Sequence, residues 1–235
     1  MAEPGISAII PALDEATHLP STLRALHGAG SLEEILVVDG GSRDGTPELA
    51  SGFEGVRVIR ARKGRGHQMN AGAREARGEV LWFIHADTRV PPGAVAGILR
   101  AMQDPRCVGG AFRFAVDSPR RRYRGLEAAV AARCRFLGLA YGDQALFAGK
   151  EAFWSLGGYP DWPYLEELPL VTGLRRQGRF ARLDLPAQTS WRRWERDGFL
   201  RASLRNLALA GSYAAGWRPR DLSTRGVGEA VMSGS

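Results

Sequence analysis

Short apolar runs alternate with helix-forming patterns through the first half of the chain. Strands are expected at 6–10, 35–38, 56–59 and 80–84, and helices at 16–27, 46–51, 66–76 and 91–102. Apolar runs bounded by glycine, proline and aspartate are typical of buried strands, and their alternation with helices indicates βαβ units. The first half therefore predicts an α/β fold with a mostly parallel sheet.

The second half is less regular. Strands are expected at 109–116, 144–149 and 180–185, helices at 120–136 and 165–177, and a last helix carries Leu200, Leu204, Leu207 and Gly211 along one side. No stretch has the composition of a linker, so we expect one domain over residues 1–235, with halves of about 1–115 and 116–235.

Polar side chains gather where the predicted parallel strands end. Asp14 and Glu15 follow the first strand, Asp39 ends the second, and His85 and Asp87 follow the fourth. Open α/β sheets bind ligands beyond the carboxyl ends of their strands. This arrangement predicts a ligand site at that edge of the sheet.

Asp39 and the glycines after it suit a ligand contact. A carboxylate at a strand end can accept a hydrogen bond from a base imide or a ribose hydroxyl, and Gly40 and Gly41 let the backbone approach a ligand closely. The alternative is a strand–turn–helix junction in which Ser42 or Asp44 caps the following helix.

Asp87 is a candidate ligand for Mg²⁺ or Mn²⁺, since a single carboxylate can hold such an ion against a diphosphate when water and phosphate oxygens complete its shell. His85 is either a second ligand or a hydrogen-bonded support, because imidazole accepts Mn²⁺ more readily than Mg²⁺. The alternative for Asp87 is a turn or capping role before Pro91.

Gly64 and Gly66 begin a pattern resembling a dinucleotide fingerprint, but Met69 stands in place of the third glycine. This argues against a Rossmann oxidoreductase. Lys63 and Arg65 can still neutralise the phosphates of a ligand.

Composition and charge limit the binding partners and the cellular location that can be expected. The formal net charge is +7 and the pI about 10.1, which admits an anionic partner, yet no nucleic-acid-binding module is visible and no such partner is expected. The two cysteines lie in no metal-binding pattern and predict free thiols in a reducing compartment.

With no signal-like start and no long apolar run, a cytoplasmic protein is expected. The basic run 120–124 and the last helix leave peripheral membrane contact open.

Four segments together resemble the inverting family-2 glycosyltransferases with a GT-A fold. They are Pro11-Ala-Leu-Asp-Glu15, Val38-Asp-Gly-Gly-Ser-Arg-Asp-Gly-Thr46, Gly64-Arg-Gly-His-Gln-Met-Asn70 and His85-Ala-Asp87. The resemblance covers roughly the first 180 residues. It implies a nucleotide-sugar donor, with Asp39 facing the uracil of a UDP-sugar and Asp87 matching the last aspartate of a metal-binding Asp-x-Asp motif.

The residues expected to bind the donor come from both halves of the chain. They are Pro11, Ala12, Asp14, Glu15, Asp39, Gly40, Gly41, Lys63, Arg65, Gln68, Ala86, Asp87, Arg192 and Arg193. Asp14 stands where the family usually has asparagine, Met69 where arginine is common, and His85 where the first aspartate of Asp-x-Asp is usual.

The acceptor side is expected around Glu166 and Glu167, which stand where the family has a Glu-Asp pair. By position Glu167 matches the catalytic base, which takes the proton of an attacking hydroxyl, and Glu166 its neighbour. The alternative is an acidic helix start that complements the helix dipole.

The segment Gly142-Asp143-Gln144 is also expected on the acceptor side. Tyr141-Gly142-Asp143-Gln144, together with the stretch 189–194, resembles a bacterial subgroup named for arsenosugar biosynthesis and radical-SAM/selenium gene neighbourhoods. Arg192 and Arg193 can stabilise a leaving diphosphate, or instead pack on tryptophan at the surface.

The predicted function is transfer of a sugar from a nucleotide sugar to a small-molecule or lipid-linked acceptor with inversion, assisted by Mn²⁺ or Mg²⁺. The rival is a nucleotide-binding protein of the same fold without turnover, which the Glu-Glu pair and His85 permit. The oligomeric state stays open.

Overall fold

The computed structural model describes residues 3–162, 165–191 and 211. Of the expected last helix, Leu200, Leu204 and Leu207 therefore lie outside the described residues, as do Arg192 and Arg193. Among the helices of the described part, none is both long and apolar enough to cross a membrane.

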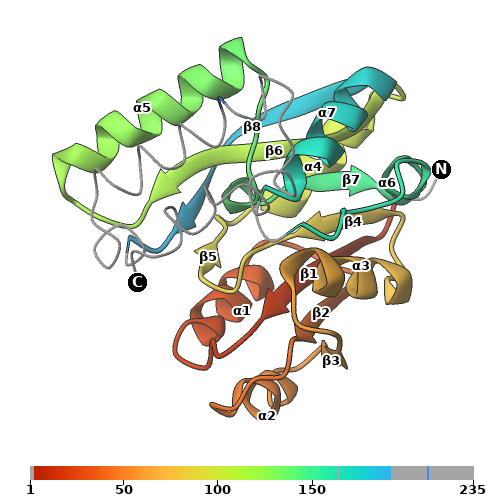
Figure 1. The fold of residues 1–235 in the computed structure, drawn as a ribbon, viewed down its shortest axis with the longest axis vertical. Coiled ribbons are helices and arrows are strands. Elements are labelled where there is room, and N and C mark those ends of the chain that lie inside the picture. The colour runs from red at the N-terminus through yellow and green to blue at the C-terminus, as the bar shows by residue number, and fades with distance from the viewer. Residues whose placement is uncertain (1–2, 163–164, 192–210, 212–235) are drawn as a thin grey trace, which may run out of the picture.

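In the part of the chain that the structure describes, eight strands form one sheet in the order β3-β2-β1-β4-β7-β6-β8-β5 (Figure 1). They are β1 (Ile6–Ala12), β2 (Glu34–Asp39), β3 (Val56–Arg60), β4 (Val80–Phe83), β5 (Thr88–Arg89), β6 (Cys107–Val116), β7 (Phe147–Gly149) and β8 (Arg179–Thr189). Strands β1 to β4 are parallel, as the apolar pattern predicts. β7 pairs antiparallel with β4 and β6, β6 and β8 are parallel, and β5 is antiparallel to β8.

The helices of the described part follow the expected order with shifted ends. They are α1 (Leu19–His27), α2 (Thr46–Ser51), α3 (Arg65–Glu75), α4 (Ala94–Met102), α5 (Arg121–Phe136), the 3₁₀ turn η1 (Gly142–Gln144), α6 (Lys150–Ser155) and α7 (Glu167–Gln177).

Three departures from the predicted elements have local causes. The helix expected from residue 91 begins at Ala94, because Gly93 takes a left-handed backbone with φ of 79°. The strand expected at 144–149 is reduced to β7, since η1 occupies 142–144. The helix α6 was not predicted, because its six residues are too short to show a helical period.

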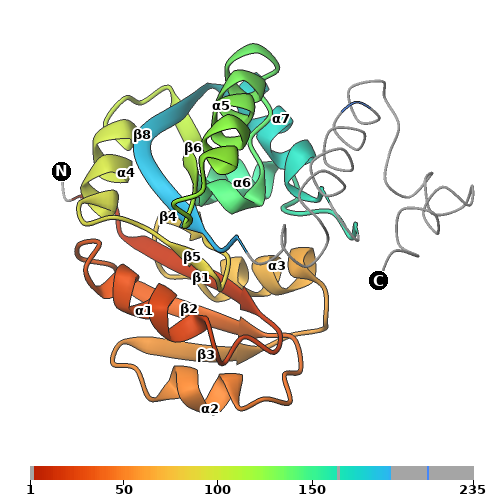
Figure 2. The ribbon, with the colours of Figure 1, turned by 90° about the vertical axis from the view of Figure 1, so that its left-hand side faces the viewer.

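Apolar side chains cover both faces of the parallel strands, which is why these strands read as continuous apolar runs. On one face Ile6, Ala8 and Ile10 of β1 pack in a cluster with α1 and α4. On the other face Ile9 packs in a cluster with α3, α6 and α7. Figure 2 shows α1 and α3 on opposite sides of β1.

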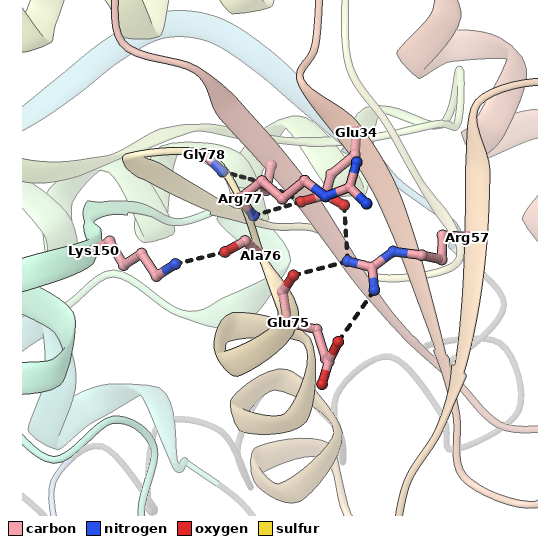
Figure 3. Close-up of polar contacts among 8 residues, drawn as sticks. Glu34, Arg57, Glu75, Ala76, Arg77, Gly78 and Lys150 are labelled. Carbon is pink, nitrogen blue, oxygen red and sulfur yellow. Dashed lines mark hydrogen bonds and ion pairs between the residues drawn. The ribbon is translucent and has the colours of Figure 1, made fainter.

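A polar hub joins elements at the amino-terminal edge of the sheet, opposite the predicted site (Figure 3). The Glu34 carboxylate accepts hydrogen bonds from Ser7 Oγ (2.9 Å), Arg77 N (2.6 Å) and Arg57 Nη2 (2.9 Å). Arg57 also bonds to Glu75 at the end of α3. Burial raises the pKa of Glu34, but these hydrogen bonds outweigh it and the pKa is lowered overall.

Candidate functional site

The loops after β1 and β2 interlock through their own polar groups. Asp39 is 2% exposed, and its carboxylate accepts the backbone N–H of Gly41 (3.0 Å) and of Ser42 (3.1 Å). Asp14 Oδ1 accepts the N–H of Arg43 (2.8 Å), and Asp14 N donates to Ser42 Oγ (2.9 Å). Oδ2 accepts from both Gly41 N and Ser42 N, whereas Oδ1 accepts from Ser42 N alone, so Oδ1 can still accept from a ligand.

Asp44 links the loops after β1 and β2, although the N-cap residue of α2 is Gly45 and not Asp44 or Ser42. Asp44 Oδ1 accepts the N–H of Thr46 (3.0 Å) at the start of α2, and its Oδ2 accepts the N–H of Ala16 (2.9 Å). The N–H of Glu15 donates to Thr46 Oγ1 (2.9 Å). The first turn of α2 thereby fixes the loop that carries Asp14 and Glu15.

Gln68 ties the ends of β1 and β2 together. Its buried Nε2 donates to the carbonyls of Ala12 and Val38, both at 2.8 Å. A Cβ at Gly40 would lie 3.0 Å from the Gln68 side chain, so this close packing favours glycine there. The amide nitrogen of Gln68 is thus committed to the scaffold, and a donor contact by Gln68 stays a prediction.

The loop that carries His85, Ala86 and Asp87 follows β4 and is held from two sides. Thr22 Oγ1 in α1 donates to the Ala86 carbonyl (2.8 Å). On the other side a Cβ at Gly142 would lie 2.7 Å from His85 Nε2, so the imidazole packs directly against η1. His85 and Asp87 are both half-buried.

Within the described residues, no three His, Cys, Asp or Glu side chains are grouped so that they could hold a metal ion. Mg²⁺ in nucleotide sites is commonly held by one or two carboxylates together with substrate phosphates. The Asp87 carboxylate, a hard oxygen ligand beside the sheet edge, fits a site of this kind. The described residues do not fit a site in which the protein alone supplies all the ligands.

Glu166 and Glu167 are 1% and 7% exposed, at the start of α7. Glu166 Oε1 pairs with Nε of Arg65, the first residue of α3. Glu167 Oε1 accepts the N–H of Gly142 (3.2 Å). The pair does form an acidic helix start, but the expectation that this start is solvated is wrong, because both carboxylates are buried against other elements.

Burial raises the pKa of Glu166, and the neighbouring charge of Glu167 raises it further, while Arg65 opposes both effects. Two tyrosines share this environment. Burial, followed by the charges of Glu167 and Glu166, raises the pKa of Tyr159. Burial is also the main cause that raises the pKa of Tyr141 to about 12.

Arg65 and Lys63 differ from the expectation that both face phosphates. The guanidinium of Arg65 is engaged by Glu166, and the charges of Glu167 and Asp143 also act on it. Lys63 is exposed, and no ion pair of Lys63 occurs within the part of the chain that the structure describes. Phosphate binding by either residue stays a prediction.

Gln144 is buried and serves the scaffold. Its Oε1 accepts from Tyr141 N (3.1 Å) and Arg133 Nη2 (3.2 Å), and its Nε2 donates to the Phe112 carbonyl (3.1 Å). These bonds fix η1, whose Gly142 contacts both His85 and Glu167. The structure therefore brings the predicted metal loop, the acceptor-side turn and the predicted base together.

Tyr141 and Asn70 are site residues that the sequence did not single out. Asn70 exchanges two hydrogen bonds with the backbone of Tyr159 (2.8 and 2.9 Å), which anchors the segment before α7 to α3. Both lie within segments that carry the family resemblance, Asn70 at the end of one and Tyr141 at the start of another, and this was the signal that could have found them.

Comparison with known proteins places these motifs in a family. Residues 7–153 match the model of the family described as glycosyl transferase family 2. A dolichol-phosphate mannosyltransferase of Mycosarcoma maydis is 33% identical over 113 residues, covering 42% of this chain and 38% of the relative. An undecaprenyl-phosphate 4-deoxy-4-formamido-L-arabinose transferase of Pseudomonas aeruginosa is 32% identical over 130 residues, covering 50% and 38%. The chain thus spans less than two fifths of the length of these relatives.

Solved structures show the same fold. TarS of S. aureus superposes with a TM-score of 0.64 at 13% identity, over 87% of this chain and 39% of that one. A mannosyltransferase of Pyrobaculum calidifontis in complex with GDP-Man and Mn²⁺ superposes with a TM-score of 0.56 at 19% identity, over 80% and 57%. The α/β fold predicted from the sequence is confirmed. The family match extends over more than half of this chain and shows that the chain belongs to glycosyl transferase family 2.

Proposed function

We propose that this protein transfers a sugar from a nucleotide-sugar donor to an acceptor nucleophile with inversion at the anomeric carbon. The observation that carries the proposal is the convergence on Gly142, whose backbone packs against His85 and donates to Glu167. The loop of His85 and Asp87, proposed to hold the metal and the diphosphate, therefore lies beside Glu167, the proposed base. A transfer in a single displacement requires these groups to be close together.

In the proposed step, a Glu167 carboxylate oxygen takes the proton of an acceptor hydroxyl as that oxygen attacks the anomeric carbon. The bond from this carbon to the diphosphate oxygen breaks, and the nucleoside diphosphate leaves with the electron pair. Arg65 and Glu166 hold the start of α7 against α3 and so orient Glu167. A divalent ion held by Asp87 would offset the charge on the departing diphosphate.

The donor end of the site is proposed at the interlocked loops after β1 and β2, with Asp39 as the contact to the base. UDP is the proposed nucleotide, in line with the resemblance, and another TarS structure is described as a complex with UDP-GlcNAc. Since one related structure is a complex with GDP-Man, guanosine donors belong in the test.

The acceptor is proposed to be a small molecule or a lipid-linked compound. Two relatives are named for transfer to dolichol phosphate and undecaprenyl phosphate, which favours a lipid phosphate and contact with a membrane surface from the cytoplasm. A phosphate monoester presents unprotonated oxygens near neutral pH, so its attack needs no general base, and dependence on Glu167 separates the two acceptor classes.

The test combines thermal shift with donor hydrolysis, using UDP- and GDP-sugars with and without Mn²⁺. We expect a metal-dependent rise in the melting temperature that Asp39→Ala and Asp87→Ala abolish, whereas Glu48→Gln, an exposed change on α2, leaves it intact. With a hydroxyl acceptor, Glu167→Gln should lower kcat by roughly 10²- to 10⁴-fold while donor binding persists.

The rival function, nucleotide binding without turnover, makes a different prediction. It expects the same thermal shifts but no release of nucleoside diphosphate from any donor. Shifts that neither Asp39→Ala nor Asp87→Ala alters would show that the site lies elsewhere.

A further inference from the structure

A second concave site lies between α5, β6 and β8, and its lining includes Gln144 but no other residue predicted to contact the donor or the acceptor. This cleft has a volume of about 410 Å³. Its walls are mainly apolar, with Phe112, Phe114 and Val130 buried in the molecule, and Phe180 and Leu183 completing them. Volumes of about 300–1,000 Å³ with apolar walls and few polar groups are typical of small-molecule sites.

Positively charged side chains outnumber negatively charged ones around the cleft. Four arginines line it against two carboxylates, Glu127 and Asp184. Both carboxylates have arginine partners, since Asp184 pairs with Arg113 (2.7 Å) and Glu127 with Arg124 (2.9 Å). The exposed guanidinium groups of Arg135, Arg175 and Arg182 form no ion pair with a carboxylate within the described part of the chain.

Two of these arginines contact the end of α5 or the residues that follow it. Arg182 Nη1 donates to the Cys134 carbonyl (3.2 Å) near the end of α5. The Arg175 guanidinium covers Gly138, where a Cβ would lie 2.0 Å from Nη1. With Arg135 on the last turn of α5, three cations border an apolar hollow.

We infer that this cleft binds an anionic amphiphile, a molecule with one apolar chain or ring system and a carboxylate or phosphate head. Burial of the apolar part against the phenylalanines supplies binding free energy. The arginines select a negative head, for which guanidinium is well suited. Of the residues predicted for sugar transfer, Gln144 alone lines the cleft, so the inference does not depend on the proposed function.

The test measures binding of dodecyl phosphate, dodecanoate and dodecanol to the full chain by calorimetry, below their micelle concentrations. The two anions distinguish a phosphate from a carboxylate head, and the alcohol tests the need for charge. Ala131→Trp places a large side chain in the cleft. Ala132→Trp, at the next position of α5, is also exposed but lies outside the lining, and it is the matched control.

We expect at least one anion to bind, with dodecanol at least about tenfold weaker, which is a difference of ~1.4 kcal/mol. Ala131→Trp should weaken the anion at least tenfold relative to Ala132→Trp. Absence of binding by both anions, equal affinity for dodecanol, or equal affinity in the two tryptophan variants would overturn the inference.

A second measurement needs no variant. Cys134 lines the cleft and Cys107 does not, and both thiols are free and buried. The bound anion should slow modification of Cys134 by a small thiol reagent several-fold relative to Cys107. Equal effects on both cysteines would mean a general change in stability and would contradict a ligand in this cleft.

Discussion

Two buried polar atoms near the predicted base lack a hydrogen-bond partner within the part of the chain that the structure describes. They are Tyr141 Oη and Glu166 Oε2. Buried polar groups in native proteins are nearly always bonded, so such atoms mark places where a ligand or water binds. We expect an acceptor group to bind there, next to Glu167.

Tyr141→Phe tests this at the level of one atom. Because Tyr141 Oη has no described partner, its removal should change the free energy of unfolding by less than about 0.5 kcal/mol. The KM for the acceptor should rise several-fold, with donor affinity unchanged. Tyr123→Phe, a buried tyrosine whose hydroxyl accepts from Arg122 (3.3 Å), is the control and should leave KM unchanged. An unaltered KM in Tyr141→Phe would exclude an acceptor contact.

Helices α3 and α5 differ in how closely they approach the rest of the molecule. In α3, a Cβ at Gly72 would lie 2.5 Å from Ile9 Cγ2 and 3.0 Å from Val38 Cγ2. In α5, a Cβ at Gly125 would have nothing within 4 Å. The close approach of α3 places Gln68 between the ends of β1 and β2. Gly72 permits this approach and so helps to position the site.

Glycine-to-alanine changes should therefore have opposite signs in the two helices. Gly72→Ala overpacks the core and should lower the free energy of unfolding by about 1–3 kcal/mol. Gly125→Ala adds helix propensity without a clash and should raise it by roughly 0.5–1 kcal/mol. Urea unfolding of the two variants measures both effects, and a loss of stability in Gly125→Ala would show that α5 is packed differently.

At the scale of the whole molecule, the Glu34 hub joins β1, β2, β3 and α3 at the edge opposite the site (Figure 3). The pKa of Glu34 is lower in the fold than its ordinary value of 4.5. Its contribution to stability is therefore complete above that value and is lost as the pH falls through the pKa of the folded state.

Glu34→Gln should reduce the free energy of unfolding by about 1–3 kcal/mol at pH 7, since charge-assisted bonds to a buried group are lost. The difference from the wild type should shrink as the pH falls below about 4.5. Glu33→Gln, the exposed neighbour, is the control and should have little effect. A difference between wild type and Glu34→Gln that is constant with pH would show that the carboxylate is not stabilised in the fold.

The amino-acid pattern alone specified the parallel half of the sheet, because its strands are buried on both faces and read as unbroken apolar runs. It also placed Asp39 and Asp87 at strand ends, since chain order dictates which residues follow a parallel strand. The antiparallel insertion of β7 and the pairing of β6 with β8 were not predictable, because such pairings join residues far apart in the chain.

Only the tertiary structure decided which predicted residues meet. Arg65 was expected at a phosphate, yet packing of α3 against the start of α7 pairs it with Glu166. Gln144 was expected to face an acceptor, but its bonds to Arg133, Tyr141 and Phe112 are made within the protein. Spacing along a chain indicates which chemistry is available, whereas burial and long-range contacts determine which side chain is committed to the scaffold and which can face a ligand.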